Sequence, residues 1–508
     1  MKKQTRREFL IAGAAGVAAL GLTRFSVDGA VDIEEATIAD LQSKMRSGEL
    51  TARKLVEMYT ARISEIDLKL RSVVEINPDA LAIADILDNE RKRGKFRGPM
   101  HGIPVLIKDN IDTADKMKTT AGSLALLDAP APKRDAFVAK KLRAAGAVIL
   151  GKTNLSEWAN FRSTKSVSGW SGRGGQTNNP YILDKNPCGS SAGSGVAVSA
   201  NLCAAAIGTE TNGSIICPST RNGVVGIKPT LGLVSRSGII PIAHTQDTAG
   251  PMCRTVADAA AVLSAIVGTD KSDAITADAS KGAKDYTKFL EADGLKGARL
   301  GVVRQYLGNN ADTKRIFEAQ LEVLKIAGAT LIDVTFPEEL SKLGDDRLSV
   351  LLYEFKTDLN KYLAARGSQY KTLGDLIKYN NDNKEKEMPI FAQELFEQSE
   401  AKGGLADKAY LDSLAKIKSA TRENGIDALI ARHDIDALVA PSTGAAWSIA
   451  AVAGYPFITV PAGFINGLPV GIGFFGKAFT EPALIKFAYA FEQKTKARRK
   501  PEYIPASQ

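Results

Sequence analysis

Short apolar runs that alternate with helical segments constrain the fold of this chain most. Residues 102–107 form one such run, a helical pattern follows from Phe137 to Gly146, and a second apolar run spans residues 147–151. Buried strands separated by helices are typical of sheets that are covered on both faces. The pattern predicts an α/β fold: a large mixed, mostly parallel central sheet, flanked by helices on both faces, in a single compact domain.

The rest of the chain extends this prediction. Residues 34–93 repeat apolar side chains at helical spacing, and Thr51 is placed to cap a helix. Further elements are expected as a strand within residues 296–305, a largely helical stretch at 336–432, strands at 437–440 and 457–460, and a final helix from Pro482.

Residues 165–255 have a different composition. They are rich in Gly, Ser, Thr and Asn and show little periodicity of either kind. Ile, Val and Leu occur throughout the segment, which distinguishes it from a disordered linker. We therefore expect loop backbone packed around a functional site.

The amino-terminal residues have the pattern of a targeting signal. Arg6 and Arg7 precede a short apolar run at residues 11–20, which is too short to span a bilayer. Paired arginines before such a run are typical of a twin-arginine signal, which directs the export of folded proteins. An amphipathic helix is the alternative. We expect residues 1–30 to be this signal, with export to the bacterial periplasm by the twin-arginine machinery and no stable membrane anchor.

The net charge of +9 is partly concentrated at the amino terminus, and one further basic cluster lies near the carboxyl end. Residues 1–30 hold five basic and two acidic residues, which accounts for +3 and leaves +6 for the remainder. A basic cluster near the carboxyl end has no interleaved aromatic residues, so a solvated helix end is favoured over a nucleic-acid-binding patch. The cluster consists of Lys494, Lys496, Arg498, Arg499 and Lys500.

Cysteine and histidine usage argues against a metal site. The four cysteines, Cys188, Cys203, Cys217 and Cys253, form no CxxC pair and lie among small or apolar residues. This pattern favours buried free thiols over zinc ligands. The three histidines are not at ligand spacing, and the sequence contains no phosphate-binding loop or dinucleotide fingerprint. No metal or cofactor is expected.

Two segments carry residues suited to catalysis. Lys108 ends the first apolar run, where burial would lower the pKa of its amine. A lysine whose head reaches solvent is the alternative. Residues 208–215 (Gly-Thr-Glu-Thr-Asn-Gly-Ser-Ile) place backbone N–H groups beside the hydroxyl of Ser214, as an oxyanion hole requires, and a plain loop is the alternative there.

A third segment, residues 189–195 (Gly-Ser-Ser-Ala-Gly-Ser-Gly), lets the backbone approach a substrate closely. It also matches the G-x-S-x-G nucleophile elbow around Ser191. No apolar strand precedes the match, however, and His244 and His433 lack a persuasive acidic partner. The elbow interpretation is therefore disfavoured.

Taken together, these three segments resemble the amidase signature family. The resemblance implies a triad of Lys108, Ser190 in a cis peptide bond, and the nucleophile Ser214. It also implies an oxyanion hole made by the backbone N–H groups of Thr211, Asn212, Gly213 and Ser214. Further similar segments are residues 151–154, 222–230 and 467–471. The implied activity is hydrolysis of carboxamide bonds through an acyl-enzyme, with release of ammonia and without a cofactor.

Other segments are similar to bacterial peptide amidases, which remove the carboxy-terminal amide of peptides. This resemblance implies a small-molecule or peptide amide as substrate and no nucleic-acid partner. One alternative is a glutamine-hydrolysing component of an amidotransferase, against which the export signal argues. The other is a non-catalytic binding protein, which the intact triad disfavours. The similar segments are residues 156–162, 169–171, 173–177 and 351–356.

Two departures from the family pattern bear on substrate range and local folding. Many relatives have Gly or Asp where this chain has Asn212. The peptide-amidase-like enzymes also have a longer polar loop after the residue that corresponds to Trp447.

The expected organisation is a signal segment (1–30), an N-terminal helical part (31–95), a core with the catalytic loops (96–265), a variable, largely helical substrate-side part (266–436), and C-terminal strands with a helix (437–508).

Overall fold

The computed structural model describes residues 31–505, so the signal predicted for residues 1–30 lies outside the described residues. The described chain begins with three helices, α2 (Ile38–Ser47), α3 (Ala52–Leu70) and α4 (Ala80–Lys92). The side chain of Thr51 accepts a hydrogen bond from the backbone N–H of Lys54 and caps α3, as predicted. A short strand, β1 (Val73–Ile76), lies between α3 and α4 where only helix was expected.

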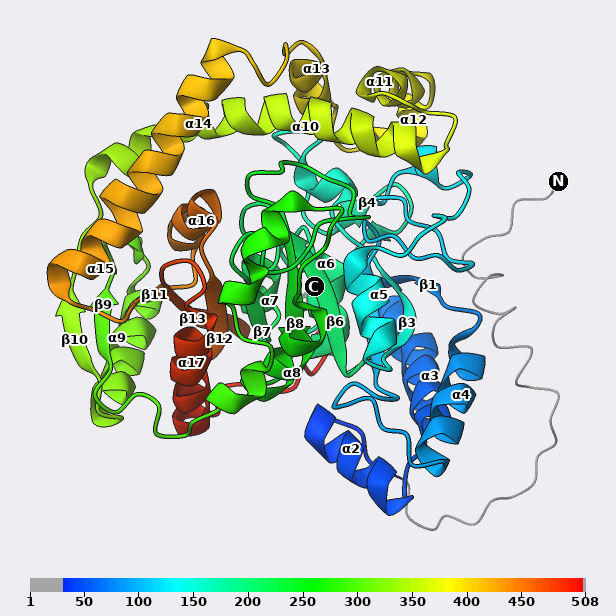
Figure 1. Cartoon of the computed structure of the whole chain (residues 1–508), viewed down its shortest axis with the longest axis horizontal. Coiled ribbons are helices and arrows are strands. Elements are labelled where there is room, and N and C mark those ends of the chain that lie inside the picture. Colours follow the sequence, from blue (N-terminus) through cyan, green and yellow to red (C-terminus); the bar gives the residue numbers. More distant parts are fainter. Residues whose placement is uncertain (1–30, 506–508) are drawn as a thin grey trace.

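One eleven-stranded sheet forms the centre of the described chain (Figure 1). Besides β1 it contains β2 (Pro104–Lys108), β3 (Val148–Thr153), β6 (Ala205–Glu210), β7 (Val225–Lys228), β8 (Thr248–Cys253), β9 (Arg299–Val302), β10 (Thr330–Asp333), β11 (Ala437–Pro441), β12 (Phe457–Ile465) and β13 (Leu468–Phe475). The strand order is β1-β3-β2-β6-β8-β7-β12-β13-β11-β9-β10. A separate hairpin consists of β4 (Trp170–Ser171) and β5 (Gly175–Gln176).

The sheet is mixed, as predicted, but the expected predominance of parallel pairs is not observed. Parallel pairing is confined to β3–β2–β6 toward one end and β11–β9–β10 at the other. The remaining neighbours are antiparallel. One reason is the β12–β13 hairpin, which closes through Asn466 and Gly467, both at positive φ, and therefore needs no crossover helix.

Helices cover both faces of the sheet. One layer contains α5 (Phe137–Ala144), α8 (Val256–Ile266), α17 (Glu481–Thr495) and α9 (Ala311–Ile326), and the other contains α6 (Ala192–Ser199), α7 (Ile216–Arg221) and α16 (Gly444–Ala453). Figure 1 shows α10 (Gly344–Arg366) and α14 (Lys408–Thr421) as an arch beyond α16. The remaining helices of this part are α11 (Leu373–Asp382), α12 (Lys384–Glu387), α13 (Glu394–Glu400) and α15 (Asp427–His433).

Residues 165–255 are mostly turns and loops, as expected, but they also hold short helices and strands that the sequence-based expectation missed. They contain α6, β6, α7, β7 and β8. All eight residues of α6 are buried, so this helix has no polar face and its sequence has no amphipathic period. Small side chains are needed there because a Cβ on Gly193 would lie 2.3 Å from the carbonyl oxygen of Ser72.

The cysteines are not all free thiols. Cys188 and Cys217 form a disulfide, with 5.8 Å between their Cα atoms, whereas Cys203 and Cys253 are free and buried. Burial raises the pKa of the Cys203 thiol to about 12. The bridge joins the loop that precedes residue 190 to α7, and these segments meet only in the tertiary structure. Spacing along the chain therefore does not reveal the pair.

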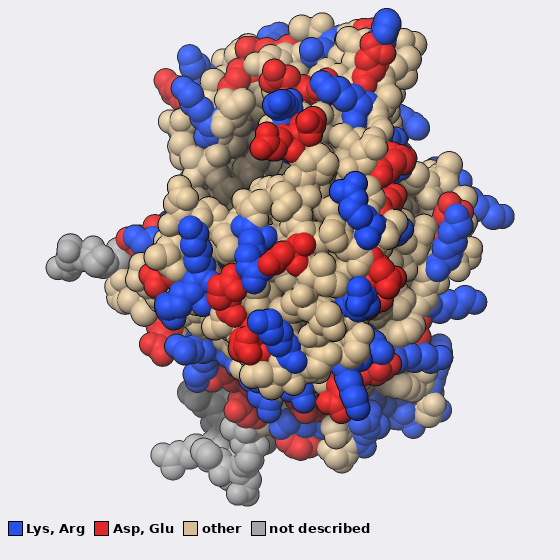
Figure 2. All heavy atoms as spheres, turned by 90° about the vertical axis from the view of Figure 1, so that its left-hand side faces the viewer, with Lys and Arg blue, Asp and Glu red and all other residues tan. Residues whose placement is uncertain are grey.

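The basic cluster near the carboxyl end takes part in ion pairs. Arg498 pairs with Glu35 at 2.7 Å, and Lys500 pairs with Glu34 at 2.9 Å. Figure 2 shows Lys and Arg interspersed with Asp and Glu on the face that carries β10, α9 and α15, and a hollow near the upper part of this face. Within residues 31–505, none of the helices is both long and apolar enough to cross a bilayer.

Candidate active site

Lys108 lies at the end of β2, and its side chain is fully buried. Its Nζ is 2.7 Å from Ser190 Oγ and 2.8 Å from Thr209 Oγ1, and it donates a bond of 3.2 Å to the Thr209 carbonyl. Burial lowers the pKa of Lys108 to about 7, although the carboxylates of Asp247 and Glu210 act in the opposite direction. The alternative of a lysine head in solvent is wrong.

Ser190 is held in a tightly packed loop. The peptide bond between Gly189 and Ser190 is cis, as the resemblance implied. The carbonyl of Ser190 accepts a bond of 3.0 Å from the N–H of Ser156, and a Cβ on Gly189 would lie 2.3 Å from Ser156 Oγ. The next residue, Ser191, donates its N–H to the carbonyl of Ser214 at 3.1 Å. A backbone hydrogen bond thus joins the two serine-bearing loops directly.

Ser214 lies in a turn whose backbone donors are exposed to the site. Gly213 has a φ of +82°, in the left-handed region that favours glycine. Glu210 Oε2 accepts the N–H groups of Ile215 and Ile216 at 2.8 and 3.0 Å, which holds the turn from the protein side. Within residues 31–505, no hydrogen-bond acceptor lies on the N–H of Gly213 or Ser214. These two donors are free to bind an oxyanion.

The short connection after Trp447 forms part of a helix. Trp447 and Ser448 lie within α16, so local folding is intact at this departure from the family pattern. Ser448 Oγ accepts bonds from Asn212 Nδ2 at 3.0 Å and from Arg347 Nη1 at 2.7 Å. A Cβ on Gly213 would lie 2.4 Å from Trp447 Nε1. Helix α16 therefore packs directly on the turn that bears the predicted oxyanion donors.

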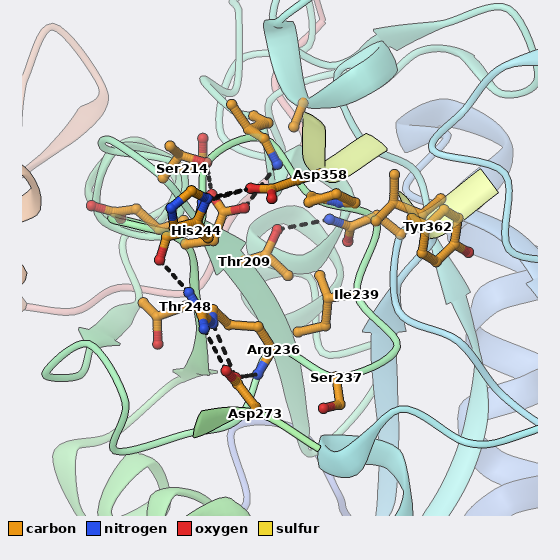
Figure 3. Close-up of a pocket in the computed structure, with 18 of the residues that line it drawn as sticks. Thr209, Ser214, Arg236, Ser237, Ile239, His244, Thr248, Asp273, Asp358 and Tyr362 are labelled. Atoms are coloured by element: carbon orange, nitrogen blue, oxygen red, sulfur yellow. Dashed lines mark hydrogen bonds and ion pairs between the residues drawn. The ribbon is translucent and has the colours of Figure 1, made fainter. Parts of the chain in front are cut away.

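Ser190 and Ser214 line the same cleft, whose volume is about 290 Å³ (Figure 3). Thr211 also lines it, and its hydroxyl donates to Asp247 at 2.5 Å. The apolar part of the wall comes from Ile239, Ile240, Pro241 and Ile242, and α10 contributes the opposite, more polar part. The titratable residues of the lining are Glu210, Arg236, His244, Asp247, Asp273, Asp358, Lys361 and Tyr362.

The structure contradicts the nucleophile-elbow interpretation of Ser191. Its buried hydroxyl donates to the Thr209 carbonyl at 3.1 Å and accepts the Thr209 N–H at 3.2 Å. His244 does have an acidic partner, since its Nδ1 lies 2.8 Å from Asp358 Oδ2. That partner is on α10, 114 residues further along the chain, so inspection of neighbouring sequence did not find it.

His244, Glu354 and Asp358 place potential ligand atoms within 4.8 Å of one another, an arrangement that sequence spacing did not show. Both oxygens of Glu354 already accept hydrogen bonds, one from Tyr410 and one from Thr245. Burial lowers the pKa of His244, but the hydrogen bond to Asp358 and the charge of Glu354 outweigh this effect and raise that pKa above its usual value. His244 is thus hydrogen-bonded to Asp358 and lies within ion-pair distance of Glu354.

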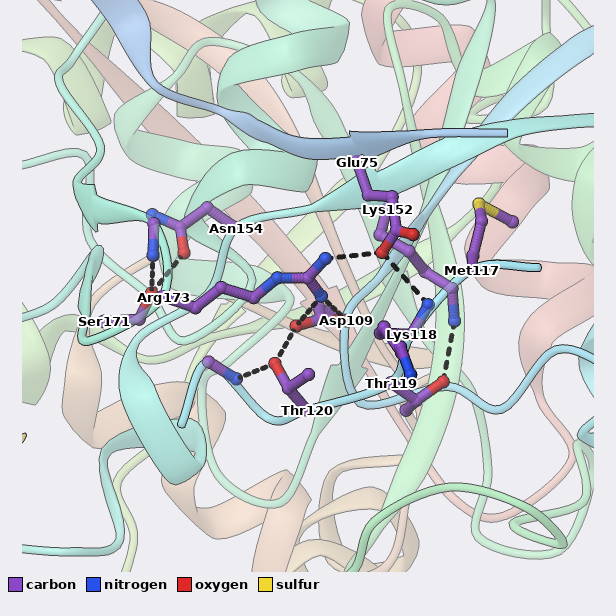
Figure 4. Close-up of polar contacts among 12 residues, drawn as sticks. Glu75, Asp109, Met117, Lys118, Thr119, Thr120, Lys152, Asn154, Ser171 and Arg173 are labelled. Atoms are coloured by element: carbon purple, nitrogen blue, oxygen red, sulfur yellow. Dashed lines mark hydrogen bonds and ion pairs between the residues drawn. The ribbon is translucent and has the colours of Figure 1, made fainter. Parts of the chain in front are cut away.

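A second buried polar cluster lies next to Lys108 (Figure 4). Arg173 donates to both oxygens of Asp109 at 3.0 Å and to Glu75 at 2.5 Å. Lys152 donates to the carbonyl of Ile111 and to a neighbouring threonine hydroxyl. These bonds tie β1, β2 and β3 together directly behind the end of β2. In the sequence, the segment around Lys152 stood out only as a similarity to the family, and Arg173 had no predicted role of its own.

Three comparisons place these features among known proteins. The sequence model of the Amidase family matches residues 54–449. A probable amidase of Arabidopsis thaliana is 45% identical over 483 residues, covering 93% of this chain and 92% of that protein. The crystal structure of native peptide amidase from Stenotrophomonas maltophilia is 49% identical, has a TM-score of 0.89, and is matched over 92% of this chain and 99% of its own. The glutamyl-tRNA(Gln) amidotransferase of Thermoanaerobacter pseudethanolicus has a component that is 32% identical over 504 residues, covering 93% of this chain and 99% of that protein.

A mixed sheet between two helical layers, with a buried lysine beside a serine-lined cleft, is the architecture of an α/β enzyme. The chain belongs to the amidase family, and the protein is a hydrolase that acts on amides. The predicted family, fold class and enzyme class are thereby confirmed.

Proposed function

We propose that Ser214 is the nucleophile of this amidase and that Lys108 acts as the base through Ser190. The observation that carries the proposal is the fully buried Nζ of Lys108, 2.7 Å from Ser190 Oγ, beside the cleft that Ser190 and Ser214 share. A lysine with its usual pKa of about 10.4 would be protonated at neutral pH and unable to accept a proton. Burial provides the neutral amine that a serine nucleophile requires.

In the proposed reaction, Lys108 takes the proton of the Ser190 hydroxyl while Ser190 takes that of Ser214. Ser214 Oγ adds to the carbonyl carbon, and the backbone N–H groups of residues 211–214 bind the oxygen that becomes negative. One such donor is typically worth about 100- to 1000-fold in rate. The proton then returns through Ser190 to the departing nitrogen, which leaves as ammonia. Water hydrolyses the resulting serine ester and releases the carboxylic acid.

We infer that the substrates are carboxy-terminally amidated peptides or similar small amides. The similarity to the Stenotrophomonas peptide amidase over nearly the whole chain supports this class. Glutamine hydrolysis of the amidotransferase type is the second candidate, supported by the 32% identity to the Thermoanaerobacter amidotransferase component. A binding protein without catalysis is the remaining hypothesis.

Ammonia release from amidated peptides, aliphatic amides, anilides and glutamine tests the proposal. We expect turnover of amidated peptides by the wild type, a loss of roughly 10⁴-fold or more in Ser214→Ala, and a loss of about 10²- to 10⁴-fold in Ser190→Ala. Ser191→Ala, which removes a structural hydroxyl from the same loop, is the control and retains activity per folded molecule. Near-native turnover in Ser190→Ala would refute the relay. Turnover of glutamine alone would favour the amidotransferase activity, and no turnover of any amide would favour a binding protein.

We also propose that residues 1–30 direct export to the periplasm by the twin-arginine machinery. The paired Arg6 and Arg7 before an apolar run support this, and so does the disulfide between Cys188 and Cys217, because such bonds persist in oxidising compartments. Cell fractionation of a bacterial host tests it. We expect the wild type in the periplasm and an Arg6→Lys, Arg7→Lys variant in the cytoplasm, whereas cytoplasmic wild type would refute export.

A further inference from the structure

The cleft beside Ser214 is acidic although the chain as a whole carries a charge of +9. Three of its carboxylates are bound by neighbouring groups of the protein. Backbone N–H groups bind Glu210 and Asp247, and Arg236 binds Asp273. The complete set is Glu210, Asp247, Asp273 and Asp358 on the acidic side, with Arg236, Lys361 and His244 on the other.

Asp358 is the carboxylate in this set that combines an unpartnered oxygen with a partly exposed side chain, whereas the unpartnered Oε1 of Glu210 is buried. Its Oδ2 accepts the backbone N–H of His244 at 3.0 Å and lies 2.8 Å from the ring Nδ1 of the same residue. Within the described part of the chain, no donor contacts Oδ1. The side chain is 18% exposed, and Asp358 and Ser214 line the same cleft (Figure 3). One oxygen is thus anchored while the other remains available.

The residues behind Asp358 keep this part of the wall negative. His244 lies between Asp358 and Glu354, whose Oε1 is 3.6 Å from His244 Nε2. Glu354 is fully buried and is bound by Thr245 and Tyr410. With Glu354 and Asp358 ionised, two carboxylates face the single imidazole of His244, although burial raises the pKa of Glu354.

We propose that Asp358 selects amide substrates that carry an ammonium group, by binding that group through Oδ1 while the carboxamide lies at Ser214. His244 is the positioning residue that fixes the carboxylate. The inference rests on the proposed hydrolysis at Ser214 and adds the chemical class of the acyl part. A hydrogen bond between an ammonium and a partly buried carboxylate is of the strong, charge-assisted kind. The ammonium belongs either to a free amino terminus or to a basic side chain.

Four dipeptide amides tested on the full-length enzyme separate these two sources. The set is Gly-Leu amide, its N-acetylated form, and N-acetylated Lys-Leu and norleucine-Leu amides. We expect the wild type to show a kcat/KM about 10- to 100-fold higher for the charged member of at least one pair. Asp358→Asn removes that preference and leaves the uncharged members within about twofold. Asp312→Asn, which alters an exposed carboxylate on α9, is the matched control and changes neither value.

His244→Gln tests the positioning role, and we expect it to raise KM for the charged substrates more than it lowers kcat. If the wild type had equal kcat/KM for the charged and uncharged members of both pairs, this result alone would overturn the proposal. A preference retained in Asp358→Asn would overturn it as well. Hydrolysis of none of the four amides would instead overturn the proposed function on which the inference rests.

Discussion

Lys108 and Lys152 are two fully buried lysines on neighbouring parallel strands, yet their surroundings differ. Lys152 is in register with Ile107 and not with Lys108, so the two side chains point to opposite faces of the sheet. Lys108 contacts the hydroxyls of Ser190 and Thr209, and burial lowers its pKa to about 7. Burial lowers the pKa of Lys152 only to about 8, because four carboxylates oppose the effect. These are Asp109, Asp112, Asp115 and Glu75.

The difference shows that burial alone does not make a lysine a base. Both amines lose hydration, but the hydroxyl partners of Lys108, Ser190 and Thr209, line the cleft, whereas Thr119, the hydroxyl partner of Lys152, does not. The carboxylates near Lys152 favour its charged form and make it a counter-ion inside the cluster of Arg173 and Asp109. This difference supports the proposed role of Lys108 in catalysis and predicts a role of Lys152 in stability.

Exchanging each lysine for methionine is expected to give the largest effects, on activity for Lys108 and on stability for Lys152. Lys108→Met removes the base and lowers kcat about 10²- to 10⁴-fold, while stability is retained because an apolar side chain replaces a buried amine. Lys152→Met removes a cation near four carboxylates and the donor to the Ile111 carbonyl, and we expect it to destabilise the fold by about 1–3 kcal/mol, with kcat per folded molecule nearly unchanged. Steady-state kinetics and urea unfolding of both variants check this, and equal losses of kcat would break the comparison.

Arg173→Met sharpens the comparison from the structural side. The substitution leaves Glu75 and Asp109 buried without their partner, and we expect a loss of about 3 kcal/mol or more in unfolding free energy. Arg173→Lys keeps the positive charge and restores part of the lost unfolding free energy. It restores only part, because an ammonium cannot contact Glu75 and Asp109 at once as the guanidinium does. If kcat of folded Arg173→Met fell as far as that of Lys108→Met, the two clusters would have to be one catalytic unit.

The smallest expected effect is a shift in pH dependence. Protonated Lys108 cannot accept a proton, so kcat/KM rises with pH and levels off above about 7. The carboxylate of Asp247 favours the protonated amine, and its removal in Asp247→Asn lowers the pKa of Lys108. The acid limb then moves to lower pH by about one unit. Asp358→Asn, in the same cleft, leaves the limb in place as a control, and an unmoved limb in Asp247→Asn would contradict the assignment.

The sequence by itself determined the features that depend on contiguous residues. Apolar runs predicted β2 and β3, Thr51 predicted a helix start, and the segments around Lys108, Ser190 and Ser214 pointed to the amidase family. Local order of this kind follows from side-chain period and backbone preference within a few residues. Prediction from local order failed at a buried helix such as α6, which has no polar face. It also failed at the β12–β13 hairpin, which pairs two strands antiparallel where parallel strands were expected.

Only the tertiary structure decided which distant groups meet. It paired Cys188 with Cys217, brought Asp358 to His244, and buried Lys108 beside Thr209, a residue 101 positions further along the chain. A pKa, an ion pair or a disulfide depends on the groups within a few ångströms of an atom, and sheet order determines those groups. The sequence therefore supplied the proposal for the reacting side chains, and the fold set their charge and their surroundings.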